Sequence, residues 1–276
     1  MRDRGTRFEC LRVRPHDHLA WVFSGSAAFV RLAEPFLAEG VALGERLMYV
    51  AADPNPAPLA GLAEVAGPRG LQVASIAEVY GPSGVVDASS QRATFARALA
   101  DALAEGYTGI RVAADNTPLV TDEVRLAAWI RWEIVADRFM SDNNVTGLCA
   151  FDSEKVAVDR LRHMASLHPL SSASSPVPQF RLFADTGQLR LEGEIDSFAV
   201  SQVRLALGAL PAKTGVLIDL ASATLRSRAA LADLRNLGQS GVAVTIQGDR
   251  DALSHLMVPD LASSEVGIEL DLQGWR

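Results

Sequence analysis

Residues 19–26 are LAWVFSGS, an apolar run at 19–23 followed at once by the short turn Ser24-Gly25-Ser26. A helical segment follows at 27–38 (AAFVRLAEPFLA), and a second apolar run lies at 46–52 (RLMYVAA). This order predicts a strand, a tight turn, a helix and a second strand. It is the opening unit of a nucleotide-binding α/β domain.

The turn lacks the residues that bind phosphate in a P-loop. Such a loop needs several glycines, whose backbone N–H groups contact phosphate, and a Lys that reaches the phosphates. This turn has one Gly and no Lys, and the nearest cation, Arg31, lies within the helical segment. We therefore expect sensing rather than catalysis, and we assign no catalytic residue and no cofactor.

Composition excludes several classes of protein. The 276 residues include 26 basic and 33 acidic side chains, a formal net charge of −7, which argues against direct binding to nucleic acid. The two cysteines form neither a C-x-x-C pair nor a disulfide framework. Neither a secretory signal nor an apolar stretch of the ~20 residues that a membrane helix needs is visible. We expect a cytoplasmic protein that does not associate with membranes.

The Ser/Pro-rich run at 171–178 (SSASSPVP) predicts an exposed linker, because it offers no core and its prolines remove backbone donors. It separates a domain at 1–170 from a smaller one at 179–276. In the first domain, strand-like and helix-like segments alternate. This favours a mostly parallel sheet with helices on both faces, and ligands of such sheets bind at the carboxyl ends of the strands.

Periodicity and turn signals place the remaining elements. In the first domain we expect strands at 71–75, 109–115 and 145–151, with helices at 57–66, 90–105, 123–140 and 153–167. The second domain is predicted as a small α/β unit. Its strands are expected at 180–183, 189–195, 215–220, 243–247 and 268–272, and its helices at 198–210, 228–238 and 249–257.

Seven short segments, spread in order along the first domain, carry a family resemblance. They are residues 17–18 (DH), 36–40 (FLAEG) with 44–45 (GE), 78–80 (EVY), 106–112 (GYTGIRV), 132–133 (WE), 148–152 (LCAFD) and 167–170 (LHPL). Together they resemble the MEDS family, the methanogen/methylotroph DcmR-type sensory domain. The resemblance implies a degenerate relative of RecA/KaiC-type ATPases that senses small molecules such as hydrocarbon derivatives. Asp115 stands where the family has Glu followed by an aromatic residue, which affects the expected ligand preference.

The second domain resembles a STAS domain, the fold of anti-sigma factor antagonists. The matching segments are 191–196 (LEGEID) and 216–220 (VLIDL), followed by a helix that starts near Arg228. In phosphoregulated members this helix opens with a phosphorylated Ser or Thr. Here the aligned residues are Ser227, Arg228 and Ala229, and the usual acceptor position falls on Arg228 or Ala229. The resemblance therefore implies a partner-binding helix start without the standard phosphoserine switch, with Ser227 as a helix cap.

His18 is placed at the start of the first strand, beside Asp17 and His16. It is either a donor that faces a ligand, half of a metal site, or a solvated or capping residue. A His-x-His pair alone does not make a zinc site, because zinc takes four protein ligands or three plus water. His163 and His168 cannot be joined to His18 from sequence. We therefore predict no metal site.

The other candidate ligand contacts in the first domain are Ser24, Gly25, Arg111, Asp115, Glu133 and His168. Arg111 and Asp115 form a polar pair at a pocket mouth, with Arg111 holding an anionic or carbonyl group, or Arg111 forms an internal ion pair with Asp115 or Glu133. Glu133 shares a helix with two Trp residues, which favours a core position. His168 either contacts the ligand or only closes the domain. Cys149 is expected to be a small buried hydrophobe rather than a redox sensor.

Three functions are consistent with these features. The leading hypothesis is a bacterial regulatory protein, in which a sensory domain is coupled to a partner-binding domain. The partner would be an anti-sigma factor or another regulatory protein, and control would act on transcription. The first alternative is a nucleotide-binding switch or weak ATPase with a non-standard phosphate loop. The second is a dimeric interaction scaffold that senses nothing.

Overall fold

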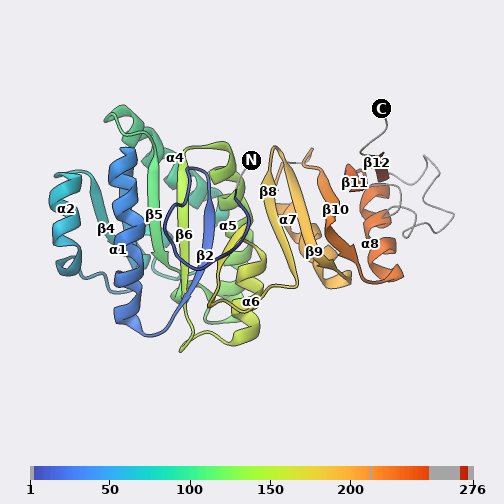
Figure 1. Ribbon diagram of the computed structural model, residues 1–276, viewed down its shortest axis with the longest axis horizontal. Helices are drawn as coiled ribbons and strands as arrows, with labels where there is room; N and C mark the ends of the chain where they lie inside the picture. The colour runs from blue at the N-terminus through green and yellow to red at the C-terminus, as the bar shows by residue number, and fades with distance from the viewer. Residues whose placement is uncertain (1–2, 212, 249–267, 273–276) are drawn as a thin grey trace. The chain divides into compact units, whose positions relative to one another are not determined.

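The structure is a computed structural model that describes residues 3–211, 213–248 and 268–272. The chain divides into two compact units, Met1–Val177 and Pro178–Arg276 (Figure 1). Each unit is an α/β fold built around its own sheet, as the sequence predicts.

The first unit contains a seven-stranded sheet with the order β1-β7-β2-β6-β5-β3-β4, and every neighbouring pair is parallel. The strands are β1 (Gly5–Arg7), β2 (His18–Phe23), β3 (Arg46–Ala51), β4 (Leu71–Ser75), β5 (Ile110–Asp115), β6 (Val145–Asp152) and β7 (Leu170–Ser172). The helices are α1 (Ser26–Leu43), α2 (Ala60–Ala66), α3 (Ile76–Tyr80), α4 (Ala88–Ala104), α5 (Glu123–Asp142) and α6 (Val158–Ser166). Short 3-10 helices lie at Ala57–Leu59 and Thr117–Val120.

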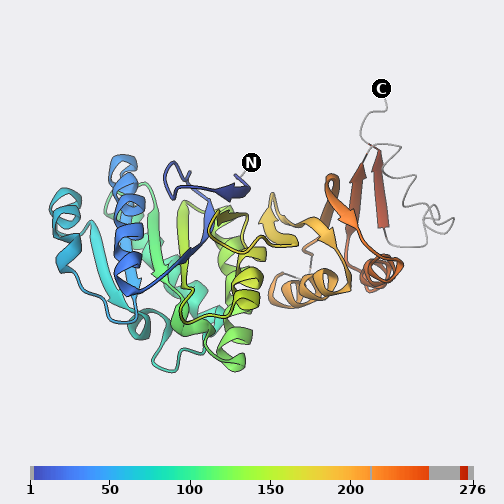
Figure 2. The same ribbon diagram turned by 60° about the horizontal axis from the view of Figure 1, so that its bottom comes forward.

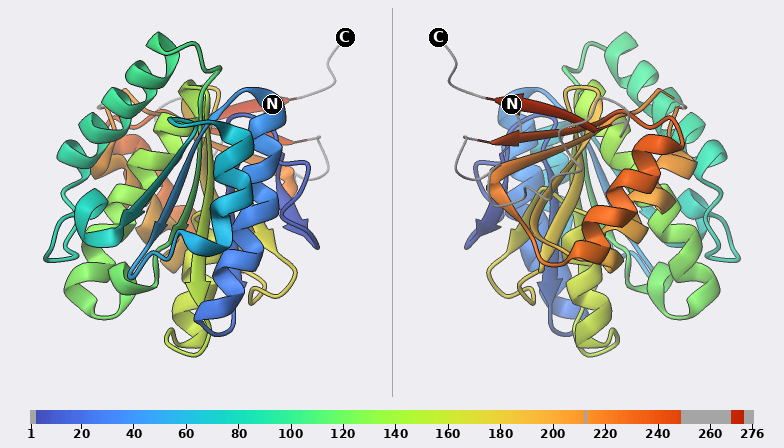
Figure 3. Two further views of the ribbon diagram at one scale, coloured as in Figure 1. Left: turned by 90° about the vertical axis from the view of Figure 1, so that its left-hand side faces the viewer. Right: turned by 90° about the vertical axis from the view of Figure 1, so that its right-hand side faces the viewer.

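Helices cover both faces of this sheet. Seen along the sheet, α1 and α2 lie on one side and α4 and α5 on the other (Figure 3). Successive strand residues point to opposite faces, so Leu19, Tyr49 and Leu148 pack in the core beneath α1. The alternate residues face α4 and α5. Because both faces are buried, the central strands are mostly apolar, and all eight residues of β6 are buried.

Helix α1 lies very close to the sheet at Gly40. A Cβ atom at this position would lie 2.6 Å from Cδ2 of Leu47 and 2.9 Å from Cδ of Arg111. Helix α1 therefore meets β3 and β5 at a point where only a residue without a side chain fits. Gly44, at φ 71°, then ends the helix in the left-handed conformation.

Two segments of the first unit differ from the predicted ones. The predicted linker begins inside the sheet, since Ser171 and Ser172 belong to β7, and both are buried together with Ser175. The Ser172 hydroxyl accepts a hydrogen bond from the backbone N–H of Val22, 3.2 Å away. Small hydroxyl side chains can thus be buried where their polar atoms are hydrogen-bonded, and composition does not reveal such bonds.

The helix expected from residue 153 begins only at Val158, because residues 152–156 form a turn whose backbone N–H groups bond to Asp152.

The second unit contains a five-stranded sheet with the order β12-β11-β10-β9-β8. Its strands are β8 (Phe180–Asp185), β9 (Gln188–Ile195), β10 (Val216–Leu225), β11 (Val244–Gly248) and β12 (Ile268–Leu272). Strands β8 and β9 form an antiparallel hairpin and the other pairs are parallel. Helices α7 (Ser197–Ala209) and α8 (Arg228–Gln239) pack against each other (Figure 2). Strand β10 continues five residues past its predicted end, after a register shift between Ile218 and Ala223. The helix predicted at 249–257 lies outside the described residues.

Within the described ranges, none of the helices has both the length and the apolar character that crossing a bilayer would require.

Candidate functional site

Four side chains with ligating atoms meet in a buried cluster between the sheet and α5. The cluster consists of His18, Glu133, Cys149 and His168. His18 begins β2 and Cys149 lies in β6. In the ladder His18 is opposite Gly147 and Ala20 is opposite Cys149, so both side chains point to the face that α5 covers.

The other two members come from segments far away in sequence. Glu133 and Asp137 lie four residues apart on α5, a spacing that puts both carboxyl groups on one side of a helix. His168 lies in the connection between α6 and β7. The parallel topology therefore brings β2, α5, β6 and this connection to one point.

The four ligating atoms lie within 4.8 Å of one another. Oε1 of Glu133 is 2.8 Å from Nε2 of His18 and 2.9 Å from Nε2 of His168. Sγ of Cys149 lies 3.3 Å from Nε2 of His18 and 3.9 Å from Oε1 of Glu133. The two imidazole rings are 4.2 Å apart between centroids. One ring nitrogen from each histidine, a carboxylate oxygen and a sulfur thus converge on a single small volume.

The second nitrogen of each imidazole has its own partner outside the cluster. Nδ1 of His18 lies 3.1 Å from Oδ1 of Asp137. Nδ1 of His168 lies 2.8 Å from the backbone carbonyl of Met164, which can only accept a hydrogen bond. Both Nδ1 atoms therefore carry the hydrogen, and both Nε2 atoms face the cluster.

Electrostatics couple these groups strongly, since all of them are buried. Burial is the largest single influence on the pKa of His18 and of His168 and lowers both, but the charge of Glu133, together with hydrogen bonds to neighbouring side chains, outweighs it and raises both. Burial would raise the pKa of Glu133, yet the two histidines hold it at about 2. Oε2 of Glu133 is buried and has no hydrogen-bond partner among the described residues. The carboxylate is therefore charged and holds the histidines through one oxygen.

Aromatic side chains surround the cluster. Trp132 stacks on Phe95 with 5.5 Å between ring centroids, and Tyr80 packs against both rings. Trp129 stacks on His168 and is fully buried. Ala114, which is opposite Cys149 in the ladder, has a small side chain and leaves room for these rings. Burial raises the pKa of Tyr80 well above its usual value, and the tyrosine stays neutral.

Gly147 makes the approach of His18 possible. A Cβ atom on Gly147 would lie 2.8 Å from Sδ of Met140 and 3.1 Å from Cδ2 of His18. The glycine thus lets α5 and the imidazole lie close to β6.

The Ser24-Gly25 turn lies at the opposite end of β2 from His18. Strands β2 and β6 are adjacent, but the connections that follow them run in opposite directions across the sheet. The chain passes from β2 to β3 on one side and from β6 to β7 on the other. Their carboxyl ends therefore form the switch point where such sheets bind ligands. In this protein the hydroxyl and N–H groups of the turn donate hydrogen bonds to acidic side chains of the same chain. Gly25 N–H donates to Oδ1 of Asp152 at 3.2 Å, and the Ser24 hydroxyl donates to Oε1 of Glu154 at 2.8 Å.

Arg111 lies neither in the buried cluster nor at the Ser24-Gly25 turn. It is fully buried on the α1 face, where Nε lies 2.6 Å from Oε2 of Glu45. Nη1 lies 3.6 Å from Glu39 and Nη2 donates to the carbonyl of Val13 at 3.1 Å. The ion pair predicted with Asp115 or Glu133 is therefore wrong. The sequence shows which acids are present. It does not show that the side chain of Arg111 points from β5 toward Glu45 on the α1 face.

Asp115 ends β5, and its Oδ1 accepts a hydrogen bond from the backbone N–H of Thr117 at 3.1 Å. Burial raises its pKa, and the bonds from Thr117 oppose the shift. A carboxyl whose pKa is higher in the folded state stabilises the fold below its unfolded pKa. This contribution is lost as pH rises through the folded pKa.

Asp115→Asn therefore should be more stable than the wild type at pH 7, because the amide keeps the acceptor oxygen and removes a buried charge. The difference in unfolding free energy should shrink as pH falls through the raised pKa of the folded protein and the carboxyl of the wild type becomes protonated. Urea unfolding of both proteins across this range measures it. A difference that is constant with pH would contradict a raised pKa.

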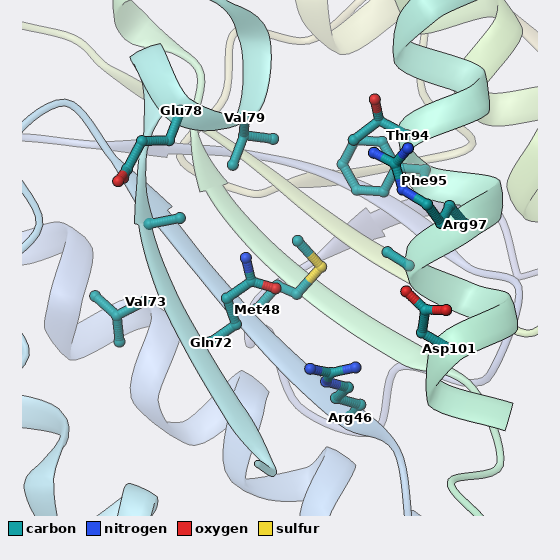
Figure 4. A pocket seen from close by; sticks show the side chains of 12 residues that line it. Arg46, Met48, Gln72, Val73, Glu78, Val79, Thr94, Phe95, Arg97 and Asp101 are labelled. Carbon is teal, nitrogen blue, oxygen red and sulfur yellow. The ribbon is translucent and has the colours of Figure 1, made fainter. Parts of the chain in front are cut away.

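A groove of about 340 Å³ opens on the α4 side of β3 and β4 (Figure 4). Arg46, Met48, Glu78, Phe95 and Arg97 are among the residues that line it. None of the candidate residues from the sequence does. Phe95 links the groove to Trp132, and so to the aromatic wall of the buried cluster.

In the second unit, Ser227 caps α8 as predicted, and its hydroxyl accepts from the N–H of Ala230 at 3.1 Å. Arg228 and Ala229 follow in the first turn and are exposed. This helix start offers no free Ser or Thr hydroxyl at the two positions after the cap.

Of the predicted contacts, the structure brings together His18, Glu133 and His168, whereas Ser24, Gly25, Arg111 and Asp115 lie elsewhere. The prediction missed Cys149 and Asp137 as members of the site. The four-residue spacing of Glu133 and Asp137 was a signal for the second acid. Nothing in the sequence sets Cys149 beside His18, because that depends on strand register.

The family model described as "MEDS: MEthanogen/methylotroph, DcmR Sensory domain" matches residues 17–169, more than half of the chain and the whole of the buried cluster. No curated protein matches the chain.

Proposed function

This chain belongs to the MEDS family, and on that premise we propose that its first unit senses a small molecule while its second unit binds a regulatory protein. The sensory role follows the family. The ligand, the partner and the connection to transcription are the proposal.

The observation that carries the sensing hypothesis is the occupied Ser24-Gly25 turn. In a phosphate-binding turn the N–H groups and hydroxyls are left for the phosphate oxygens. Here Asp152 and Glu154 accept those hydrogen bonds, and their two carboxylates would repel a phosphate. A degenerate relative of RecA/KaiC-type ATPases would keep the strand, turn and helix in this way while losing nucleotide binding.

The groove beside α4 supports the small-molecule part of the proposal. Its volume suits a compact ligand, and it combines apolar Met48 and Phe95 with the charged side chains of Arg46 and Arg97. A molecule bound there would contact Phe95 and, through it, Trp132.

The second unit supports a partner-binding role of the STAS type. Its hairpin followed by alternating helices and parallel strands is compatible with the STAS resemblance. At the start of α8, Arg228 and Ala229 stand where phosphoregulated relatives carry the acceptor, and the Ser227 hydroxyl is used as the cap. We propose control by binding to an anti-sigma factor or a similar regulator, without a phosphoserine switch.

Two measurements test the proposal. Isothermal titration with ATP and Mg²⁺ should give no binding heat, and micromolar binding would favour a nucleotide switch instead.

The tagged full-length protein, purified from its own host, should carry an anti-sigma factor or its kinase and a small molecule, both identified by mass spectrometry. Arg228→Glu should weaken the partner's recovery, whereas Arg131→Glu, an exposed change in the first unit, should not. Dimers that carry neither would favour the scaffold hypothesis.

A further inference from the structure

We propose that His18, Glu133, Cys149 and His168 together bind one zinc(II) ion. The inference goes beyond the sensory function proposed above and does not depend on it. It departs from the expectation that the chain has no metal site, which was made because His168 could not be joined to His18 from sequence.

The ring nitrogens carry the first step of the argument. Both Nδ1 atoms hold the hydrogen, because they face the carboxylate of Asp137 and the carbonyl of Met164. In neutral imidazoles both Nε2 lone pairs would then point at the same oxygen of Glu133, at 2.8 and 2.9 Å. Lone pair against lone pair at these distances is repulsive, so an electropositive centre has to lie among them. It is either protons or a metal ion.

The surroundings of the histidines are those of metal ligands. A histidine that binds a metal almost always donates its other ring N–H to a carboxylate or a backbone carbonyl, which fixes its orientation. Asp137 serves His18 in this way and the carbonyl of Met164 serves His168. A mere core histidine would not need both nitrogens fixed so that the second one points into a cluster of donors.

The donor set and its charge favour zinc. Two imidazole nitrogens, a thiolate and a carboxylate are ligands that zinc accepts in a four-coordinate site, whereas magnesium and calcium take oxygen ligands. The thiolate of Cys149 and the carboxylate of Glu133 carry two negative charges, which cancel the charge of the ion. On binding, the thiol and the two Nε2 atoms lose their protons to the buffer, and one sulfur–zinc bond and two nitrogen–zinc bonds form. A buried, neutral complex avoids the cost of leaving one of these charges unpaired.

Only small movements are needed. With Zn–N near 2.0–2.1 Å and Zn–S near 2.3 Å, the ligating atoms of a tetrahedral site lie about 3.3–3.8 Å apart. The distance from Sγ of Cys149 to Nε2 of His18 is already 3.3 Å, and that to Oε1 of Glu133 is 3.9 Å. The two contacts between Nε2 and Oε1, now 2.8 and 2.9 Å, have to lengthen by about 0.4–1.0 Å each.

The position of the site indicates what the ion does. Its ligands come from β2, α5, β6 and the α6–β7 connection, and all four are buried. Four protein ligands leave no open position for a substrate. The ion would therefore join four separate parts of the first unit and stabilise its fold, as structural zinc does.

The test begins with the full chain, freed of metal with a chelator and titrated with ZnCl₂. We expect uptake of about one zinc per chain, release of a proton that depends on Cys149, and a rise in Tm on binding. CoCl₂ in place of zinc should give the visible bands of tetrahedral cobalt and a near-ultraviolet band from sulfur-to-cobalt charge transfer. A folded wild type that takes up no zinc at pH 7, or a cobalt spectrum without the sulfur band, would overturn the proposal.

Matched variants assign the ligands. Cys149→Ala and His168→Gln should each lower zinc affinity by at least about 100-fold, a larger effect than that of residues around the ligands. Cys10→Ala and His163→Gln should bind zinc like the wild type. Cys10 is also buried, but its thiol faces the carbonyl of Leu32. Equal loss in Cys10→Ala and Cys149→Ala would overturn the assignment. If the Cys149 and His168 variants fail to fold, the cobalt spectrum of the wild type decides the question.

Discussion

Arg111→Met should lower the free energy of unfolding by about 3–5 kcal/mol, because it leaves a buried carboxylate without its partner. Arg111 is fully buried, and its Nε lies 2.6 Å from Oε2 of Glu45, whose side chain is only 2% exposed. The guanidinium also donates to the carbonyls of Phe36 and Val13, which would lose these bonds. Urea unfolding at pH 7 measures the effect.

Two further variants separate charge from packing. Arg162→Met removes an ion pair with Asp159 whose side chains are 41% and 87% exposed, and it should cost no more than about 0.5 kcal/mol. The double variant Arg111→Met with Glu45→Gln should regain a large part of the loss, because the only carboxylate that then lacks its arginine is that of Glu39, whose side chain is 26% exposed. A double variant that is no more stable than Arg111→Met would show that the cost lies in the packing around Gly40 and Phe36, where the arginine stem is enclosed.

The fold of the first unit could be predicted because its signals are local. Apolar runs such as that of residues 19–23 and the helical period of residues 90–105 depend only on neighbouring positions. Asp122 caps α5 where its side chain predicted a helix start. The buried serines of β7 could not be predicted, because what makes them acceptable there is a hydrogen bond to Val22, more than a hundred residues away.

The candidate site shows the same limit. His18, Glu133 and His168 could be named as candidates, but nothing local says that they share one oxygen. That arrangement depends on the order of the strands, on the register that sets His18 against Gly147, and on the height at which α5 crosses them. The prediction paired Arg111 with the wrong acids for the same reason. The partners that a strand residue meets depend on which face it points to and on which helix covers that face.

Glu133→Gln should destabilise the zinc-free protein by about 3–5 kcal/mol, because it removes the charge that lies against both buried histidines, of which His18 alone also faces the carboxylate of Asp137. Oε1 of Glu133 is shared by Nε2 of His18 and Nε2 of His168, and the pKa of all three groups is shifted toward the charged form. The amide oxygen of the variant can still accept a hydrogen bond, but it carries no charge. The N–H groups of the amide would also lie against the N–H groups of His18 and His168, which are donors themselves. Urea unfolding at pH 7, in the presence of a chelator, measures the loss.

Glu123→Gln is the matched control, since it makes the same change on the same helix. Its carboxylate is 83% exposed and pairs with Arg160 at 2.5 Å, so the loss should stay within about 1 kcal/mol. If Glu133→Gln were as mild as the control, Glu133 would have to be protonated in the folded protein, and the histidines neutral. The single proton of Glu133 could then bond to only one of the two Nε2 atoms that face Oε1, and the other lone pair would face this oxygen without a positive centre. A large loss shows instead that the carboxylate is charged and ready to bind a cation.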